Sequence, residues 1–263
     1  TQNSMPNPVH EGRPSPRSTA RPMWGAPPSR LSHLETPTPS LEWLEARRRA
    51  IRCEVRRIEF GDSREWEWHE GVWRHRTGGF FTVRGLRWSV PTQSALAGQQ
   101  PIMDQPEHGI LGFLIQERDG CEQVLVQAKA EPGTTGEVQM APTVQATESN
   151  YGQLHGGRSQ PFIEWFEQPD PRWVLVHQLQ SEQGTRFLAK RNRNMIVRLP
   201  SGAELEHGPN YRWIALHELR ELLLHDHVVN TDARSVLAGI PVSIPVALTG
   251  MPPTSPTATP PLA

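Results

Sequence analysis

The sequence predicts an α+β fold, in which a mixed β-sheet with flanking helices occupies residues 40–245. Three observations support this prediction. Segments of alternating apolar and polar residues fill the middle of the chain, apolar residues at helical spacing occur near both ends of the folded region, and proline-rich segments flank it. Residues 1–39 and 246–263 are rich in Pro, Ser and Thr, and we expect both segments to be disordered.

Helices are predicted at both ends of the folded region. The first begins at Ser40, a plausible N-cap, and carries Leu41, Leu44 and Ile51 on one face. The last lies within residues 211–226. Its apolar stripe consists of Trp213, Leu216, Leu219, Leu222 and Leu223.

Strands are predicted between these helices. Residues 79–90, 109–130 and 172–200 alternate or contain short apolar runs, and no internal repeat is visible. The middle segment reads as a hairpin, because its two apolar strands meet at an Asp-Gly dipeptide that favours a tight turn. Breaks or turns are expected at Gly85, Asp119-Gly120, Gly184 and residues 192–194.

Composition excludes several classes of function. The formal net charge of −1 gives no electrostatic reason to expect a nucleic-acid or membrane partner. No apolar run is long enough to cross a bilayer, and the amino end lacks a signal-peptide segment. Cys53 and Cys121 form no disulfide framework, so we expect a reducing, cytoplasmic compartment.

Polar residues are concentrated after the hairpin, and four segments, from the hairpin onward, carry a family resemblance. The segments are ILGFLIQERDGCEQVLVQAKAEPG, VQMAPTVQATESNY, LQSEQGTRFLAKRNRNMIV and VVNTDARSVLAGIP. Together they make residues 41–241 resemble the NDP-hexose 2,3-dehydratases. The resemblance implies a Nudix-like domain. Members of that family typically contain two such repeats and this chain resembles one, so we expect a homodimer.

The resemblance also implies a reaction. The substrate is an NDP-4-keto-6-deoxyhexose, with TDP as the expected nucleotide, and the product is the 3,4-diketo-2,6-dideoxy sugar. The C4 ketone acidifies the hydrogen on C3, and the hydroxyl on C2 then leaves. This chemistry needs a base, an acid and donors for the enolate oxygen, and no cofactor.

Four residues are candidates for these catalytic roles. Lys129 and Glu131 lie two residues apart on one predicted strand face, where the lysine could stabilise the enolate and the glutamate could act as base. The alternative is a solvated ion pair that contributes little. Tyr151 and His155 are the candidates for the acid, although the His-Gly-Gly sequence also reads as a turn.

A further set of uncharged and basic side chains is expected to bind the substrate. Amides and hydroxyls suit the hydroxyls of a sugar ring, and arginine forks suit a diphosphate. The alternatives are a polar loop that caps itself and a basic hairpin in solvent. For Asp232, helix capping is the favoured role. The predicted binding residues are Gln127, Gln139, Thr143, Gln145, Thr147, Asn150, Gln180, Glu182, Arg191, Arg193, Asn194, Asn230 and Arg234.

Two other functions are weighed against the lyase. A metal site at His225 and His227 is not expected, because these side chains would point apart on a helix and no ligand cluster joins them. A Nudix hydrolase needs paired glutamates on a helix, whereas Glu221 is followed by Leu222, Leu223 and Leu224. A module that binds a nucleotide sugar without converting it remains the alternative.

Overall fold

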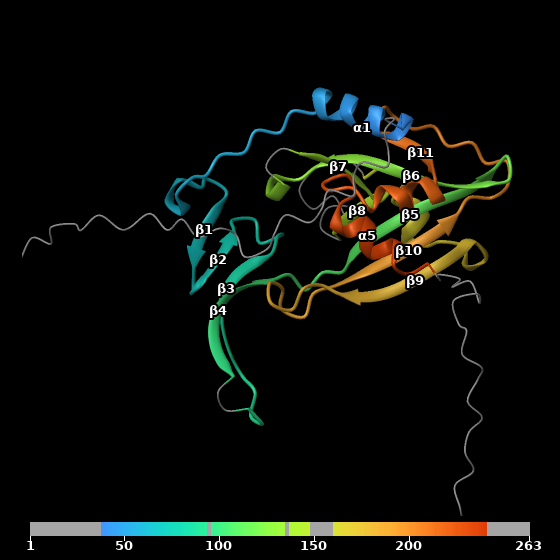
Figure 1. The fold of residues 1–263 in the computed structure, drawn as a ribbon. Coiled ribbons are helices and arrows are strands. Elements are labelled where there is room, and N and C mark those ends of the chain that lie inside the picture. Colours follow the sequence, from blue (N-terminus) through green and yellow to red (C-terminus); the bar gives the residue numbers. More distant parts are fainter. Residues whose placement is uncertain (1–37, 94–95, 135–136, 148–159, 241–263) are drawn as a thin grey trace, which may run out of the picture. The chain divides into compact units, whose positions relative to one another are not determined.

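The structure is a computed structural model that describes residues 38–93, 96–134, 137–147 and 160–240. Two β-sheets organise these residues (Figure 1). The four-stranded sheet contains β1 (Trp66–His69), β2 (Val72–His75), β3 (Thr82–Ser89) and β4 (Ala97–Asp104). The seven-stranded sheet contains β5 (Gly109–Arg118), β6 (Cys121–Ala130), β7 (Val138–Ala141), β8 (Val144–Thr147), β9 (Val174–Ser181), β10 (Arg191–Arg198) and β11 (Tyr211–Ala215).

Short helices accompany the larger sheet. The α-helices are α1 (Pro39–Ala50), α3 (Glu164–Glu167), α4 (Leu216–Leu222) and α5 (Thr231–Leu237). The 3₁₀ turns are η2 (Phe60–Asp62), η3 (Pro132–Thr134) and η4 (Pro171–Trp173). This combination confirms the predicted α+β class with a mixed sheet and flanking helices. In the described part of the chain, no helix is long and apolar enough to span a bilayer.

The larger sheet is split in its middle. Its main path runs β11-β6-β5-β10-β9, and β10 is parallel to β5 whereas the other pairs are antiparallel. β5 and β6 pair only near their shared turn, and further on β6 pairs with β7 while β5 pairs with β8. The end of β6 and the start of β5 therefore face the inserted β7 and β8, which bring polar side chains into the opening.

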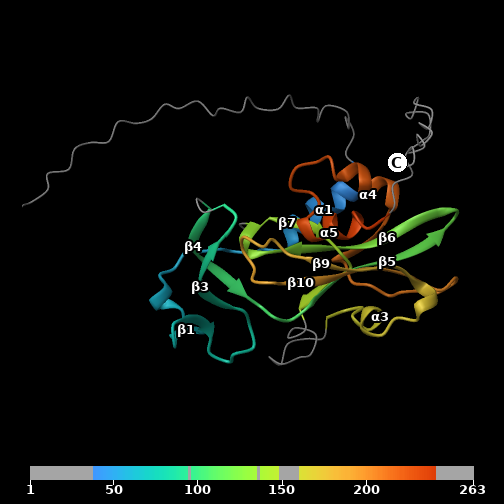
Figure 2. The ribbon, with the colours of Figure 1, turned by 90° about the horizontal axis from the view of Figure 1, so that it is seen from below.

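Two hydrophobic cores cover the faces of this sheet. α1, α4 and α5 lie on one face, where Leu44, Leu219 and Val236 pack among strand residues at 0% exposure. α3 covers the other face with Phe166 (Figure 2). Gly112 of β5 is required beneath α3, because a Cβ at this position would overlap the ring of Phe166. The helices do not cover the polar ends of β6, β9 and β10, and these ends form the site.

The predicted hairpin is confirmed. β5 and β6 are antiparallel and join at Asp119 and Gly120, whose φ angles are 53° and 72°. Two successive positive φ angles are typical of the turn that matches the twist of paired strands, and glycine adopts the second without strain.

Three predicted boundaries are wrong. Residues 211–215 form β11 rather than the start of a helix, because they pair with β6 and only residues 216–222 are helical. Residues 192–194 lie inside β10 rather than at a turn, since they pair with both β5 and β9. Gly85 does not break its strand, because it pairs with Pro101 in the middle of β3.

The first helix also begins differently from the prediction. Thr38 is its N-cap, and the hydroxyl of Thr38 accepts a hydrogen bond from the backbone N–H of Leu41 at 3.3 Å. Pro39 occupies the first helical turn, where its fixed φ is already compatible with a helix. Ser40, the predicted cap, is instead inside the helix and buried at 2% exposure.

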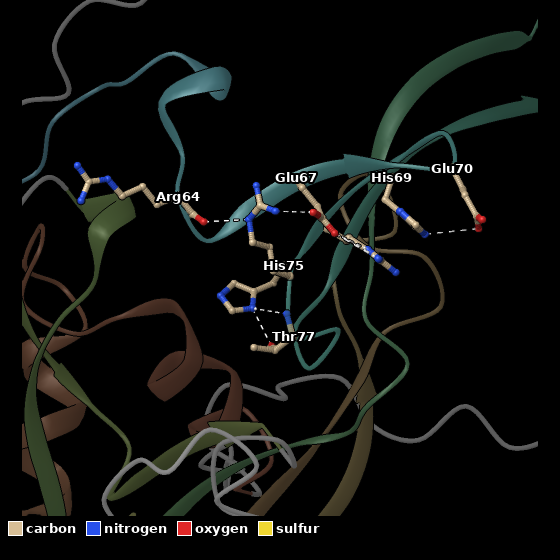
Figure 3. Close-up of polar contacts among 8 residues, drawn as sticks. Arg64, Glu67, His69, Glu70, His75 and Thr77 are labelled. Atoms are coloured by element: carbon tan, nitrogen blue, oxygen red, sulfur yellow. Dashed lines mark hydrogen bonds and ion pairs between the residues drawn. The ribbon is translucent and has the colours of Figure 1, made fainter.

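The four-stranded sheet is held by aromatic contacts and ion pairs. Glu67 of β1 accepts from Arg74 at 3.2 Å and from Arg76 at 2.7 Å, and Arg76 also donates to the carbonyl of Arg64 (Figure 3). The centroid of the Trp66 ring lies 4.9 Å from the centroid of the Phe81 ring. Surface ion pairs are worth about 0–1 kcal/mol each, and the ring contacts add to them and to the backbone pairing of β1 to β4.

Candidate active site

A polar pocket of about 210 Å³ lies where β9, β10 and the first turn of α5 meet. Strand alternation places Asn192 and Asn194 on the same face of β10, and both side chains are buried, at 7% and 1% exposure. The polar side chains that line the pocket include Gln180, Glu182, Asn192, Asn194, Asp232 and Ser235. The pocket is smaller than a typical site of 300–1,000 Å³ for a whole ligand, so its size suits one sugar ring.

The amides in this pocket are held by hydrogen bonds. Asn192 donates to Glu182 Oε1 at 2.5 Å and accepts from the N–H of Gly109 at 3.1 Å. Asn194 donates to Gln180 Oε1 at 2.8 Å and to Ser235 Oγ at 2.9 Å. Among the described residues, the buried Oδ1 of Asn194 has no partner. A buried acceptor of this kind is costly unless a ligand hydroxyl donates to it.

A second polar cluster surrounds Gln145 of β8. The amide of Gln145 donates to Glu131 Oε1 at 2.7 Å and accepts from the amide of Asn230 at 3.0 Å. Lys129 Nζ donates to the backbone carbonyl of Gln145 at 3.2 Å. The end of β6, the inserted β8 and the start of α5 are thereby joined through one side chain.

Asp232 connects the two clusters electrostatically. Burial raises the pKa of Asp232 to about 6, with further contributions from the negative charges of Glu131 and Glu182, while Lys129 and a hydrogen bond with Gln145 oppose the rise. Burial also lowers the pKa of Lys129, against the attraction of Glu131 and Asp232. A carboxyl group whose pKa is raised to about 6 therefore lies close to a lysine and two other carboxyl groups.

The structure brings together several of the predicted residues. Lys129, Glu131 and Gln145 form one cluster, and Gln180, Glu182 and Asn194 line the pocket. Gln127, Gln139 and Thr147 are half-buried on β6, β7 and β8. Asn150, Tyr151 and His155 lie outside the described residues, so their predicted roles stay predictions.

Arg191 and Arg193 do not reach the pocket. They lie on the face of β10 opposite to Asn192 and Asn194, as the alternation in the sequence predicts, and Arg191 is exposed. The predicted diphosphate contact at these arginines is therefore not part of the polar pocket.

Thr143, Asn230 and Arg234 form hydrogen bonds within the fold, and their predicted roles in substrate binding stay predictions. Thr143 is fully buried, and its hydroxyl accepts from the N–H of Leu114 and donates to the carbonyl of Leu125. Asn230 caps α5, accepting from the N–H of Ala233 at 2.8 Å. The hydroxyl of Thr143 and the amide of Asn230 thus form hydrogen bonds within the fold.

The guanidinium of Arg234 stabilises the segment between α4 and α5 through hydrogen bonds. It donates to the backbone carbonyls of Val229 at 3.0 Å, Leu223 at 2.8 Å and His225 at 3.3 Å. Arg234 therefore supports the loop that positions α5, and its predicted contact with substrate stays a prediction.

Sequence reasoning missed two residues of the site. Asn192 was identifiable, because it alternates with Asn194 on the same strand face. Asp232 was assigned to helix capping, but Asn230 takes that role. Asn230 and Asp232 lie two residues apart at the start of α5, and sequence alone does not choose between nearby capping candidates. Across the described ranges, no group of three or more His, Cys, Asp and Glu side chains is arranged to hold a metal ion.

Fold and site together define an α+β protein with a small, amide-lined and carboxylate-bearing pocket that suits an uncharged polar ring. The chain belongs to the NDP-hexose 2,3-dehydratase family, whose model matches residues 38–240.

Curated relatives of this family are similar over the same region. The chain is 44% identical over 209 residues to dTDP-4-dehydro-6-deoxy-alpha-D-glucopyranose 2,3-dehydratase from Amycolatopsis orientalis, covering 76% of this chain and 43% of that protein. Enzymes with the same name from Saccharopolyspora spinosa and Streptomyces violaceoruber are each 41% identical, over 76% of this chain and 41% and 45% of their own lengths. The chain thus spans less than half the length of these relatives.

The chain is also similar to solved structures. An ADP compounds hydrolase is 13% identical to this chain, with a TM-score of 0.39 over 64% of this chain and 87% of that one.

Proposed function

We propose that this chain is a hydro-lyase that removes water across C2 and C3 of an NDP-4-keto-6-deoxyhexose, with an NDP-3,4-diketo-2,6-dideoxyhexose as product. Membership of the dehydratase family supports the reaction class. The observation that carries the proposal is the cluster of Lys129, Glu131 and Asp232 around Gln145, beside a pocket of the size of one sugar ring. This cluster contains a carboxylate that can act as base, a carboxyl group that can act as acid and an ammonium group that can stabilise the enolate.

The first step is removal of the proton from C3. Glu131 is the proposed base, because its carboxylate is held by Gln145 at the edge of the cluster. The electron pair left by the C3–H bond is delocalised onto the C4 carbonyl oxygen, and the ammonium group of Lys129 stabilises the resulting enolate.

The second step is departure of the hydroxyl from C2. Asp232, with its pKa raised to about 6, donates a proton to this oxygen, which leaves as water. The electron pair at C3 forms the C2–C3 double bond, and the enol takes up a proton at C2 to give the diketone. Tyr151 and His155 remain candidates for the same acid role.

The amides of the pocket are proposed to hold the ring. The unpartnered Oδ1 of Asn194 suits a donating sugar hydroxyl, and Asn192 and Gln180 fix the surrounding geometry. Uncharged groups are appropriate here because the hexose itself carries no charge.

A homodimer is the proposed assembly. β9 is an edge strand of the larger sheet, and Leu175 and Leu179 are exposed on it at 48% and 52%. An exposed apolar edge favours association with a second copy around a twofold axis. Sedimentation that gives a monomer at micromolar concentration would count against this assembly. The expected cytoplasmic location stays a prediction.

Incubation with TDP-4-keto-6-deoxyglucose tests the proposed reaction. Mass analysis should reveal a product lighter by one water, and the Glu131→Gln protein should yield far less of it. Binding of the ketosugar without loss of water would instead favour a nucleotide-sugar-binding module.

A further inference from the structure

Two carboxyl groups line the polar pocket, and the proposed reaction assigns a step to only one of them. Asp232, in the first turn of α5, is the proposed acid, whereas Glu182, directly after β9, has no step. The pocket is about as wide as one sugar ring, so the two groups lie close to each other across it. Like charges at short range oppose each other, so one of the two groups keeps its proton to a higher pH.

The hydrogen bonds around Glu182 suit a carboxylate. Its Oε1 accepts from Asn192 Nδ2 at 2.5 Å. The amide of Asn192 is itself oriented, because its Oδ1 accepts from the N–H of Gly109 at 3.1 Å. A Cβ at Gly109 would lie only 2.6 Å from that oxygen, so the close approach requires glycine. Asn192 is thus fixed with its donor group toward Glu182.

Lys190 places a buried positive charge beside Glu182. Lys190 is 5% exposed and follows Ala189, whose φ of 51° is rare for a residue other than glycine. Its Nζ donates to the backbone carbonyl of Glu107, and its own carbonyl accepts from the N–H of Glu182 at 2.9 Å. Burial lowers the pKa of Lys190, against the attraction of Glu107 and Glu182. A buried ammonium group is costly unless negative charge lies near it, so Glu182 serves as a counter-charge.

The surroundings of Asp232 favour its protonated form instead. Burial raises the pKa of Asp232 to about 6, the charges of Glu131 and Glu182 add to the rise, and Lys129 and a hydrogen bond with Gln145 oppose it. Of the two carboxylates, Glu131 is the proposed base, so its charge is lost when it takes the proton from C3. Glu182 takes part in no step, so its charge still acts on Asp232 when the C2 hydroxyl leaves.

We propose that Glu182 is a positioning residue that keeps the transferable proton on Asp232. The inference rests on the proposed function, because Asp232 is the proposed acid of that reaction. It gives Glu182 a role in placing a proton, which differs from the contact with substrate that the sequence predicts. Proton transfer itself stays with Glu131 and Asp232.

NMR titration of the full chain tests this role without any turnover. The aspartate carboxyl carbons are labelled with ¹³C, and the signal of Asp232 is identified by its absence from Asp232→Asn. Its midpoint should lie near pH 6 in the unmodified chain. In Glu182→Gln the midpoint should fall by at least about half a pH unit, because a neighbouring negative charge is lost. The glutamine keeps an acceptor for the amide of Asn192.

Three further variants complete the titration. Glu182→Asp keeps the charge and should restore most of the midpoint of Asp232. Glu182→Ser is a second neutral variant and should lower the midpoint as Glu182→Gln does, which keeps the test valid if one of the two fails to fold. Glu167→Gln is the matched control, because Glu167 is exposed on α3 over the other face of the sheet. It should leave the midpoint unchanged.

The pH dependence of kcat is the second measurement. An acid that loses its proton at lower pH stops working at lower pH, so the decline of kcat on the alkaline side should move down with the NMR midpoint in Glu182→Gln. If Glu182 only contacts the sugar, KM should rise and the pH at which kcat declines should not move.

The outcomes separate this inference from the proposed reaction. An Asp232 midpoint that is the same in both neutral variants and in the unmodified chain would show that Glu182 has no such role. A midpoint near pH 4 in the unmodified chain would also overturn the inference, because Asp232 would then hold its proton no longer than an ordinary aspartate. If the midpoint falls as expected but the unmodified chain removes no water from the ketosugar, the inference holds and the proposed reaction fails.

Discussion

The side-chain amide of Gln145 donates a hydrogen bond to Glu131 Oε1 at 2.7 Å. This contact joins the end of β6 to the inserted strand β8, across the split between β5 and β6. Because the same side chain accepts from Asn230, the carboxylate of Glu131 is oriented relative to the start of α5. Asp232 lies in the first turn of that helix, so a single glutamine fixes the positions of the proposed base and the proposed acid.

Replacement of Glu131 by Gln should lower kcat by about 10²-fold or more while KM changes far less. The variant keeps the shape of the side chain and removes its ability to accept the proton from C3. Lys129→Ala should have a similar effect, through loss of enolate stabilisation. Steady-state kinetics measure both values. Glu117→Gln, in an exposed part of β5, is the control and should be unaffected. Normal turnover in both site variants would show that the site is assigned to the wrong residues.

Asp232 should make stability depend on pH. Its pKa is raised from 3.8 to about 6 in the folded chain, so folding favours the protonated form. The stabilisation from this group is complete below the unfolded pKa and is lost as pH rises through about 6. Asp232→Asn removes the ionisable group. The Tm of this variant minus the Tm of the unmodified chain should therefore increase as the pH is raised from about 4 to about 7.

Thermal unfolding of both proteins across that pH range measures the difference. A difference in Tm that stays constant with pH would mean that Asp232 titrates normally. In the same variant, kcat should fall at every pH if Asp232 donates the proton to the leaving hydroxyl.

Arg234→Gln should lower stability without changing substrate affinity. The variant leaves three backbone carbonyls without their donor, and because Arg234 is exposed, water replaces part of these contacts. We therefore expect a loss of about 1 kcal/mol, which corresponds to a fall in Tm of a few degrees. Arg220→Gln, on the exposed side of α4, should leave Tm nearly unchanged. A raised KM with an unchanged Tm would restore Arg234 to the substrate contacts that the sequence predicted.

Local patterns predicted the parts of the fold that depend on neighbouring residues. The Asp-Gly turn follows from the φ angles that these residues tolerate, and the opposite faces of Asn194 and Arg193 follow from strand alternation. The strand at residues 211–215 could not be predicted this way. Its apolar residues also fit a helical stripe, and pairing with β6 decides the outcome.

The site was predictable only in part for a related reason. Lys129 and Glu131 were found from a polar strand face and the family resemblance. The raised pKa of Asp232 depends on burial and on Glu131 and Glu182, which are distant in the sequence and meet only in the folded chain. Likewise, the insertion of β7 and β8 depends on the register of β5 and β6, which no single segment specifies.

The central claim is that the chain removes the C3 proton and the C2 hydroxyl of a 4-ketosugar. The most direct measurement is the reaction of TDP-4-keto-6-deoxyglucose in D₂O, followed by mass analysis and NMR of the product. Our account predicts that the product has lost one water and gained one deuterium at C2, because the enol takes a proton from the solvent at that carbon. A dehydrated product without deuterium at C2, or a bound ketosugar that loses no water, would contradict it.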